Sequence, residues 1–227
     1  MEERACEILN ALVREFIQTG EPVSSGWLFD HYDFGIRPAM IRSEMNELEE
    51  RGFLEQPHHS AGRIPRDRAL EFFVSSALRE TQNSPDLELL SLLHERAWNE
   101  VVGKLSDELG VLGALSSFQD VEVYKEGLEN LIDNLDWNSR EEIRSVIHDF
   151  EEFDVRVDQL KNQIANKEDD QLKVYIGRKS PVTRSNQLSV IMKNCSIDGE
   201  EVLLFAIGPK RMNYEKAVKL LKNIQEN

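Results

Sequence analysis

The stretch from Arg37 to Arg68 constrains the fold more than any other part of the chain. Pro38 suits the first position of a helix, where its missing N–H costs nothing. Gly52 can end that helix with a positive φ. Between them, apolar residues recur at helical spacing and share one face of the helix. These residues are Ile41, Met45 and Leu48.

A hairpin is expected directly after this helix. The apolar pair Phe53-Leu54 is followed by turn-forming residues from Pro57 to Gly62, and then by Arg63-Ile64 before Pro65. A helix followed by a hairpin with a polar, partly basic tip is typical of a winged helix. In such a domain the outward helix face enters a DNA major groove, and the hairpin tip touches the backbone or the minor groove.

The outward face of the expected helix carries side chains that can read bases. Ser43 and Asn46 can hydrogen-bond base edges, and Ala39 can meet a thymine methyl group. Arg42, at the edge of that face, and Arg63, near the tip, are better placed for phosphates or a minor groove. An alternative is that Arg63 only pairs with a surface carboxylate such as Glu55. The predicted DNA-binding residues are Arg37, Ala39, Met40, Arg42, Ser43, Asn46, His58, His59, Ser60, Arg63 and Arg66.

The charge of the chain argues against indiscriminate nucleic-acid binding. The formal net charge is −15. Residues 1–75 alone carry eight Lys and Arg against fourteen Asp and Glu. Because affinity for DNA depends heavily on neutralising phosphates, an acidic protein must concentrate its positive charge locally. We therefore expect weak binding to random DNA and a steep loss of affinity with salt.

Helices are expected on both sides of this stretch. Apolar residues repeat at i, i+3 and i+4 from residue 2 to 19, and Ser24 or Ser25 can cap a short second helix. Pro65 is expected to open a fourth helix that runs to about Arg79. A turn or linker at residues 83–86 then marks the domain boundary. Residues 1–82 are thus predicted to form a winged-helix DNA-binding domain, and residues 83–227 a second domain.

The second domain is predicted to be α+β. One helical run is expected over residues 87–109, another from Arg140 to Phe153 or on towards Ile164, and a last one after Asn213. The 87–109 run can pair with a second copy or lie on its own domain. Residues 110–118 suit a strand or a buried turn, and residues 166–171 a polar turn. Further strands are expected at 121–124, 172–177, 187–193 and 201–208, with a hairpin turn at Asp198-Gly199.

Five segments follow one another in an order that matches a known family. They are TGEPVSS at 19–25, PAMIRSEM at 38–45, LEERGFLEQPH at 48–58, SAGRIP at 60–65 and IGPKRMNY at 207–214. On these residues the chain resembles HrcA, the heat-inducible repressor of bacterial chaperone operons. The resemblance implies a cytoplasmic homodimer that binds an inverted-repeat operator, a GAF-like second domain, and support of the active repressor by the chaperonin GroEL.

The chain departs from that family at several places. Its length implies that the inserted dimerising segment and the middle of the GAF-like sheet are missing or heavily cut. Arg37 and Met40 stand where Ser and Thr are usual, Ser43 where Asn is usual, and His59 where Thr is usual. Arg178-Lys179 replaces a Glu-Asn pair. The second domain is therefore expected to be a reduced GAF-like domain, and the chain should dimerise through residues 87–109 or that domain.

Signatures of catalysis are scarce. No glycine-rich phosphate loop, supported Ser–His–Asp order or paired Cys motif is present, so we predict neither an enzyme nor a bound cofactor. His58 and His59 are adjacent on a hairpin and would point in opposite directions, so a metal site is not expected. Cys6 and Cys195 show no metal-ligand spacing. The alternative function is a ligand-sensing winged-helix regulator, and a third is an architectural module that has lost DNA binding.

Overall fold

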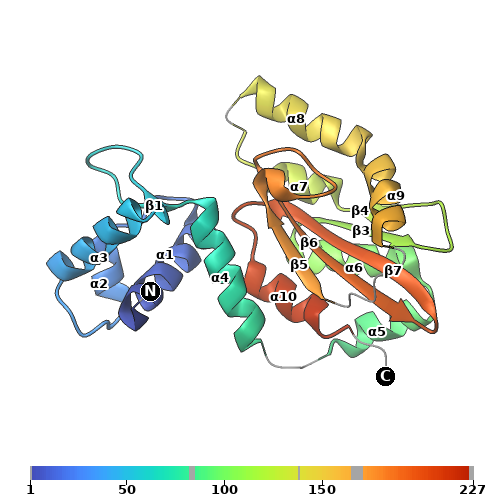
Figure 1. Ribbon diagram of the computed structural model, residues 1–227, viewed down its shortest axis with the longest axis horizontal. Helices are drawn as coiled ribbons and strands as arrows, with labels where there is room; N and C mark the ends of the chain where they lie inside the picture. The colour runs from blue at the N-terminus through green and yellow to red at the C-terminus, as the bar shows by residue number, and fades with distance from the viewer. Residues whose placement is uncertain (1, 82–84, 138, 165–170, 225–227) are drawn as a thin grey trace. The chain divides into compact units, whose positions relative to one another are not determined.

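The computed structural model describes residues 2–81, 85–137, 139–164 and 171–224 (Figure 1). The chain divides into two compact units, residues 1–79 and 80–227. The domain boundary expected after residue 82 lies outside the described residues, as does most of the polar turn expected at 166–171.

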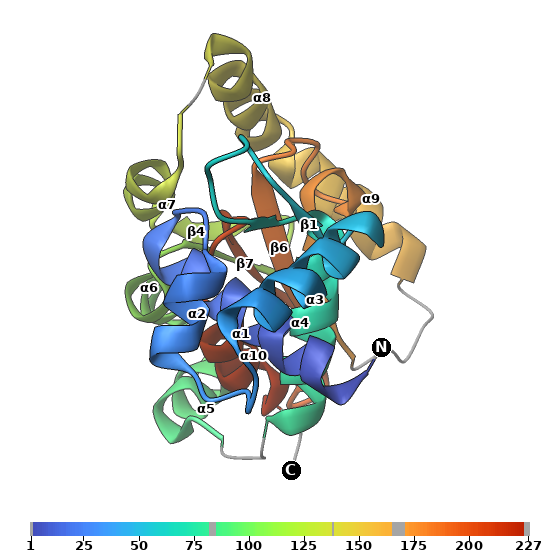
Figure 2. The ribbon, with the colours of Figure 1, turned by 90° about the vertical axis from the view of Figure 1, so that its left-hand side faces the viewer.

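The first unit is built from helices and one short hairpin. Its elements are α1 (Glu3–Thr19), α2 (Ser25–His31), α3 (Pro38–Glu50), β1 (Leu54–Glu55), β2 (Ile64–Pro65) and α4 (Asp67–Glu80). α3 packs across α1 through its apolar stripe, in which Ile41, Met45 and Leu48 are all buried (Figure 2). Pro38 occupies the start of α3, and Gly52 follows the helix with φ 76°.

The expectation that Pro65 opens the fourth helix is wrong. Pro65 lies in β2 opposite Leu54, and α4 begins two residues later at Asp67. The backbone N–H of Arg66 donates to the carbonyl of Phe53, 2.8 Å away. Because this bond continues the hairpin pairing beyond Pro65, the helix cannot start before the chain has left the hairpin.

The second unit is organised around a five-stranded antiparallel sheet in the order β4-β3-β7-β6-β5. The strands are β3 (Leu112–Ser117), β4 (Tyr124–Glu126), β5 (Leu172–Ile176), β6 (Leu188–Ile197) and β7 (Glu200–Pro209). The predicted turn joins β6 to β7, with Asp198 at φ 51° and Gly199 at φ 77°. β4 starts later than the strand expected at 121–124, and β6 and β7 are longer than expected.

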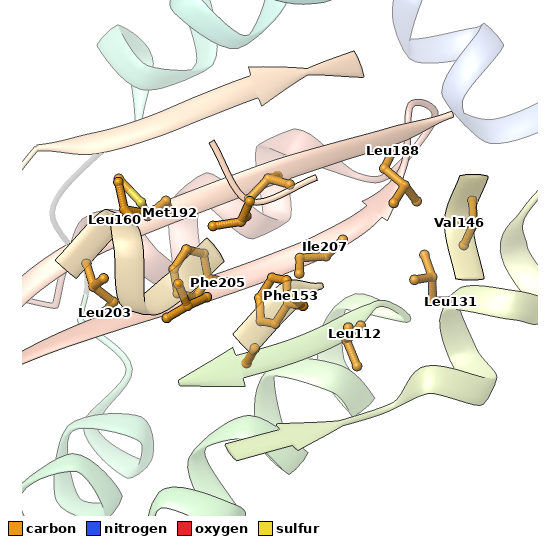
Figure 3. Packing of buried hydrophobic residues seen from close by; sticks show 14 of the residues in the cluster. Leu112, Leu131, Val146, Phe153, Leu160, Leu188, Met192, Leu203, Phe205 and Ile207 are labelled. Carbon is orange, nitrogen blue, oxygen red and sulfur yellow. The ribbon is translucent and has the colours of Figure 1, made fainter. Parts of the chain in front are cut away.

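Helices cover both faces of this sheet. On one face lie α7 (Leu128–Asn134) and α9 (Phe153–Ile164), and α8 (Arg140–Glu151) packs at the end of the same core. Figure 3 shows Phe153 of α9 against Phe205, with ring centroids 5.7 Å apart, and Val146 of α8 next to Leu131. On the other face lie α6 (Trp98–Leu109), against β3 and β4, and α10 (Tyr214–Lys222), against β5 and β6. Because both faces are covered, nearly every residue of β3, β6 and β7 is buried.

The single helix expected over 87–109 is two helices, α5 (Leu87–His94) and α6. The chain turns between them at Arg96, which has φ 56° and pairs with Glu200 at 2.9 Å. Lys104 joins the two helices through Glu88 and Glu108, and hydrogen bonds to these carboxylates raise the pKa of Lys104. α6 lies on its own sheet, so the continuous seam needed for pairing with a second copy is absent.

The run expected from Arg140 towards Ile164 is also divided, into α8 and α9 at Glu152. The break lets α8 lie at the end of the sheet while α9 covers its face (Figure 1). Within the described residues, no helix combines the length and the apolar character that crossing a bilayer requires.

Candidate nucleic-acid interface

The outer face of α3 presents five of the predicted site residues to solvent. Ala39, Met40, Arg42, Ser43 and Asn46 are all exposed, while the opposite stripe of the helix is buried. At about 100° per residue, Ala39, Arg42 and Asn46 fall on one strip of the helix surface. Small and hydrogen-bonding side chains on one exposed helix face are suited to the edges of base pairs.

The loop between β1 and β2 has a defined shape, and it projects from the helices of the first unit (Figure 1). The Gln56 side-chain amide donates to the carbonyls of His59 (3.1 Å) and Ala61 (2.9 Å). His58, His59 and Ser60, the predicted tip residues, are exposed at its end.

The base of the loop is fixed against the start of α2. Val23 and Arg63 exchange backbone hydrogen bonds of 2.9 and 2.8 Å. Gly62 lies so close to this pairing that a Cβ atom there would come within 2.3 Å of the Val23 carbonyl. Only glycine allows this approach, so the position of the loop depends on it.

Arg63 ties the loop to α3. Its Nε atom lies 2.7 Å from a carboxylate oxygen of Glu49, and one of its terminal nitrogens donates to Oδ1 of Asn46 at 2.8 Å. The side chain is 13% exposed. The carboxylate that pairs with Arg63 is therefore Glu49, whereas Glu55 pairs with Arg66 at 2.9 Å. Arg63, Asn46 and Glu49 form a connected group, which we call the wing latch.

Arginines balance much of the acidic charge around α3. Besides Glu49 and Glu55, Glu44 pairs with Arg4 at 2.9 Å and Glu47 with Arg51 at 3.4 Å. Among the residues that the structure describes, Arg37 and Arg42 have no carboxylate partner and are exposed. Their charges are the ones most available to an incoming phosphate.

A polar hollow of about 560 Å³ lies between the start of α2, the side of α3 and the loop. Hydroxyl, amide and guanidinium groups from three separate segments line it. They include Ser24, Ser25, Arg42, Asn46, Gln56 and Ser60. Donors of this kind, gathered around a concave surface, match the oxygen atoms of a sugar–phosphate backbone.

The second unit has an exposed surface of the opposite character. A groove of about 690 Å³ runs between α7 and α8 and is lined mainly by apolar side chains. Five of these are 37–51% exposed: Leu128, Ile132, Trp137, Ile143 and Ile147. We call this surface the α7–α8 groove.

Comparison with known proteins identifies the family of the chain. A family model described as the HrcA protein C-terminal domain matches residues 70–218. The chain belongs to the HrcA family. A protein named heat-inducible transcription repressor HrcA from Lachnoclostridium phytofermentans is 23% identical, with 99% of this chain and 95% of that protein aligned. The HrcA of Natranaerobius thermophilus is 37% identical over 53% of this chain and 40% of its own length.

The fold of the whole chain also has a counterpart among solved structures. A crystal structure titled as a hypothetical protein superposes with a TM-score of 0.76 at 17% identity, over 98% of this chain and 95% of that one. The alignment with the L. phytofermentans HrcA spans 331 positions, although this chain has 227 residues. The chain described here is therefore shortened internally relative to that HrcA, and it still has a five-stranded sheet.

Sequence reasoning overlooked two residues of this HrcA surface. Gln56 was not singled out, although a polar side chain directly before Pro57 is well placed to bond the carbonyls of a turn. Glu49 was not among the predicted site residues, yet its carboxylate lies 2.7 Å from Nε of Arg63. In the described part of the chain, no three His, Cys, Asp or Glu side chains gather where they could hold a metal ion.

Proposed function

We propose that this chain is a sequence-specific DNA-binding repressor of chaperone operons that binds an inverted-repeat operator as a dimer. The exposed face of α3 carries the proposal, because its small and hydrogen-bonding side chains are backed by a fully apolar stripe. Membership of a family of heat-inducible transcription repressors supports it. The first unit then acts as a winged helix, with α3 as the recognition helix and the loop between β1 and β2 as the wing.

In this proposal the contacts divide by role. Ala39, Ser43 and Asn46 meet base edges in the major groove, with Met40 at the margin of the same face. Arg37 and Arg42 hold phosphates, which fix the register of α3 on the duplex. From the wing, the residues 58–60 and Arg63 approach the backbone or the minor groove, and Arg66 lies near the base of the wing.

The proposal is tested by comparing two variants on operator and random DNA. Replacing Asn46 with Ala should cost about 1–3 kcal/mol of binding free energy on the operator and little on random DNA. Replacing Arg42 with Ala should weaken binding to both DNAs and reduce the slope of log affinity against log salt by about one unit. The measurement is footprinting and salt titration of the purified chain on a chaperonin promoter.

Exposed residues of the second unit provide matched controls for this experiment. Asn99→Ala and Arg178→Ala remove the same chemical groups from α6 and from the turn after β5, and should leave both DNA affinities unchanged. Protection of no promoter sequence by the parent chain would overturn the proposal. If Asn46→Ala lowers the affinity for operator and random DNA equally, Asn46 does not read bases.

Two modes of control are compatible with this repressor. By family resemblance, we propose that GroEL supports the active form, so that unfolded clients that occupy the chaperonin relieve repression. The alternative is that a small molecule in the second unit controls DNA binding. The α7–α8 groove has a volume typical of ligand pockets, but among the described residues that line it only Glu151 is charged, and small-molecule sites use several placed polar groups. Operator affinity that responds to metabolites and not to chaperonin would favour the alternative.

A further inference from the structure

The α7–α8 groove stands on a firmly held helix. Val146 of α8 is buried in the core of the second unit, and Phe150 packs against that core. Asp149 is fully buried and accepts backbone N–H bonds from Arg184 and Ser185, each 2.7 Å long. Since α8 is fixed in this way, its exposed isoleucines cannot turn inward to escape water.

The exposed apolar area is continuous and comes from two helices. Leu128 and Ile132 are one turn apart on α7, and Ile143 and Ile147 are one turn apart on α8. Single exposed apolar residues are common, but a contiguous apolar surface marks a site of association. The indole N–H of Trp137, which lines the groove, already donates to the carbonyl of Ile132 at 3.0 Å, so it is not available to a polar ligand. An apolar protein surface suits the groove better than a polar ligand or a nucleic acid does.

The charges beside the groove identify the partner surface. At about 100° per residue, Arg140, Arg144 and Glu151 lie within roughly 60° of Ile147 around α8. Both cations are in the first half of the helix, and the carboxylate is at its end. This order opposes the helix dipole, which favours acids at the start and bases at the end. On other faces of α8, the acidic residues Glu141 and Glu142 lie in the first turn, as the helix dipole favours. Helix stability therefore does not explain why the charges beside the groove have the opposite order.

We propose that the α7–α8 groove is where two copies of this chain associate, with their α8 helices antiparallel across a two-fold axis near Ile147. In that arrangement Arg144 of each copy faces Glu151 of the other, and the two apolar stripes cover one another. A parallel arrangement would place Arg144 opposite Arg144. Among the described residues of one chain, the only basic group paired with Glu151 is the exposed His148, at 3.7 Å, and Arg144 has no carboxylate partner. The self-complementary order is what a two-fold interface requires.

This inference supplies the second copy that the proposed function needs, and it rests on that function for its biological purpose. Its test requires no DNA. Sedimentation of the full chain at micromolar concentration should show a dimer, and Ile147→Asp should raise the dimer dissociation constant at least 100-fold. Val121→Asp is the matched control, because Val121 is 95% exposed and lies outside the groove; it should leave the constant unchanged. Circular dichroism of each variant shows whether its fold is retained.

Charge reversal tests the antiparallel register directly. Arg144→Glu and Glu151→Arg should each weaken self-association about tenfold, because each places like charges in contact twice. An equimolar mixture of the two variants should dimerise as well as the parent chain, since both contacts then join opposite charges. A parent chain that is monomeric, an equal effect of the Ile147 and Val121 variants, or a mixture that stays dissociated would each overturn the proposal.

The outcomes for DNA separate this inference from the proposed function. A folded, monomeric Ile147→Asp chain should still protect half of the operator at higher concentration. If the parent chain dimerises through the groove and protects no DNA, the repressor proposal fails and the association surface stands. If it protects a full operator and Ile147→Asp binds as tightly as the parent, the repressor proposal stands and the groove proposal fails.

Discussion

Asp149 in the second unit and Arg63 in the first both tie a loop to a helix, but they do so in different surroundings. Asp149 is fully buried and accepts bonds from Arg156, at 2.6 Å, and from the backbone of Arg184 and Ser185. Arg63 is 13% exposed, forms an ion pair with Glu49 and donates a hydrogen bond to Asn46 at the surface of α3. A buried charge cannot exchange its partners without a large desolvation cost, whereas a partly exposed one can. The first contact therefore fixes structure, and the second can change when a phosphate arrives.

The largest effect should come from breaking the buried anchor. Asp149→Ala leaves the Arg156 guanidinium and two backbone N–H groups without their acceptor in the interior. We expect a loss of about 3–5 kcal/mol in the free energy of unfolding of the second unit. Urea titration followed by circular dichroism measures it. Asp158→Ala, at an exposed position on α9, should change stability by no more than about 0.5 kcal/mol, and an equal loss in both variants would contradict the anchoring role.

A smaller effect is expected where the wing meets the start of α2. A methyl group at Gly62 would overlap the Val23 carbonyl, so Gly62→Ala must shift the wing or break the pairing of Val23 with Arg63. We expect a loss of about 1–3 kcal/mol in the stability of the first unit, typical of overpacking. A thermal melt measures it. Gly103→Ala is the control, because a Cβ there has no atom within 4 Å; if Gly62→Ala is equally well tolerated, the close approach is unimportant.

The difference between local and distant contacts explains what the sequence could predict. α3, its stop at Gly52 and the turn at Asp198-Gly199 follow from neighbouring residues, and each was predicted correctly. The division of the 87–109 run was missed, because Arg96 adopts a positive φ while pairing with Glu200, which is more than a hundred positions away. No spacing rule connects such residues.

The site shows the same division. The exposed face of α3 followed from helical periodicity, but the wing latch did not. Arg63 and Glu49 come from different elements, and their pairing depends on how the hairpin folds back over the helix. A helix was expected from Arg140 to Phe153 or on towards Ile164, but the exposed apolar residues of α8 were not singled out. Because α8 ends at Glu151 and, of its apolar residues, only Val146 and Phe150 pack inward, Ile143 and Ile147 are left in solvent.

The smallest and most informative effect concerns the wing latch. In the free protein, Arg63 is held by Glu49, so binding a phosphate requires this surface ion pair to open, at a cost on the order of 1 kcal/mol or less. Glu49→Gln removes the competing charge and should strengthen binding to random DNA by less than about tenfold, with a salt slope steeper by about one unit. Salt titrations of DNA binding measure both quantities.

Two further variants show whether this gain passes through Arg63. Glu50→Gln makes the same change of charge at the next residue, which lies on a different side of α3. It should steepen the salt slope less than Glu49→Gln does. Adding Arg63→Ala to Glu49→Gln should return the slope to the parent value or below it, because the released cation is gone. Suppose that Glu49→Gln and Glu50→Gln change the salt slope equally, and that adding Arg63→Ala to either variant leaves its slope unchanged. Arg63 would then only position Asn46 and the wing. The surface contact would then be structural, like the buried contact of Asp149, and α3 with Arg37 and Arg42 would carry the DNA contacts alone.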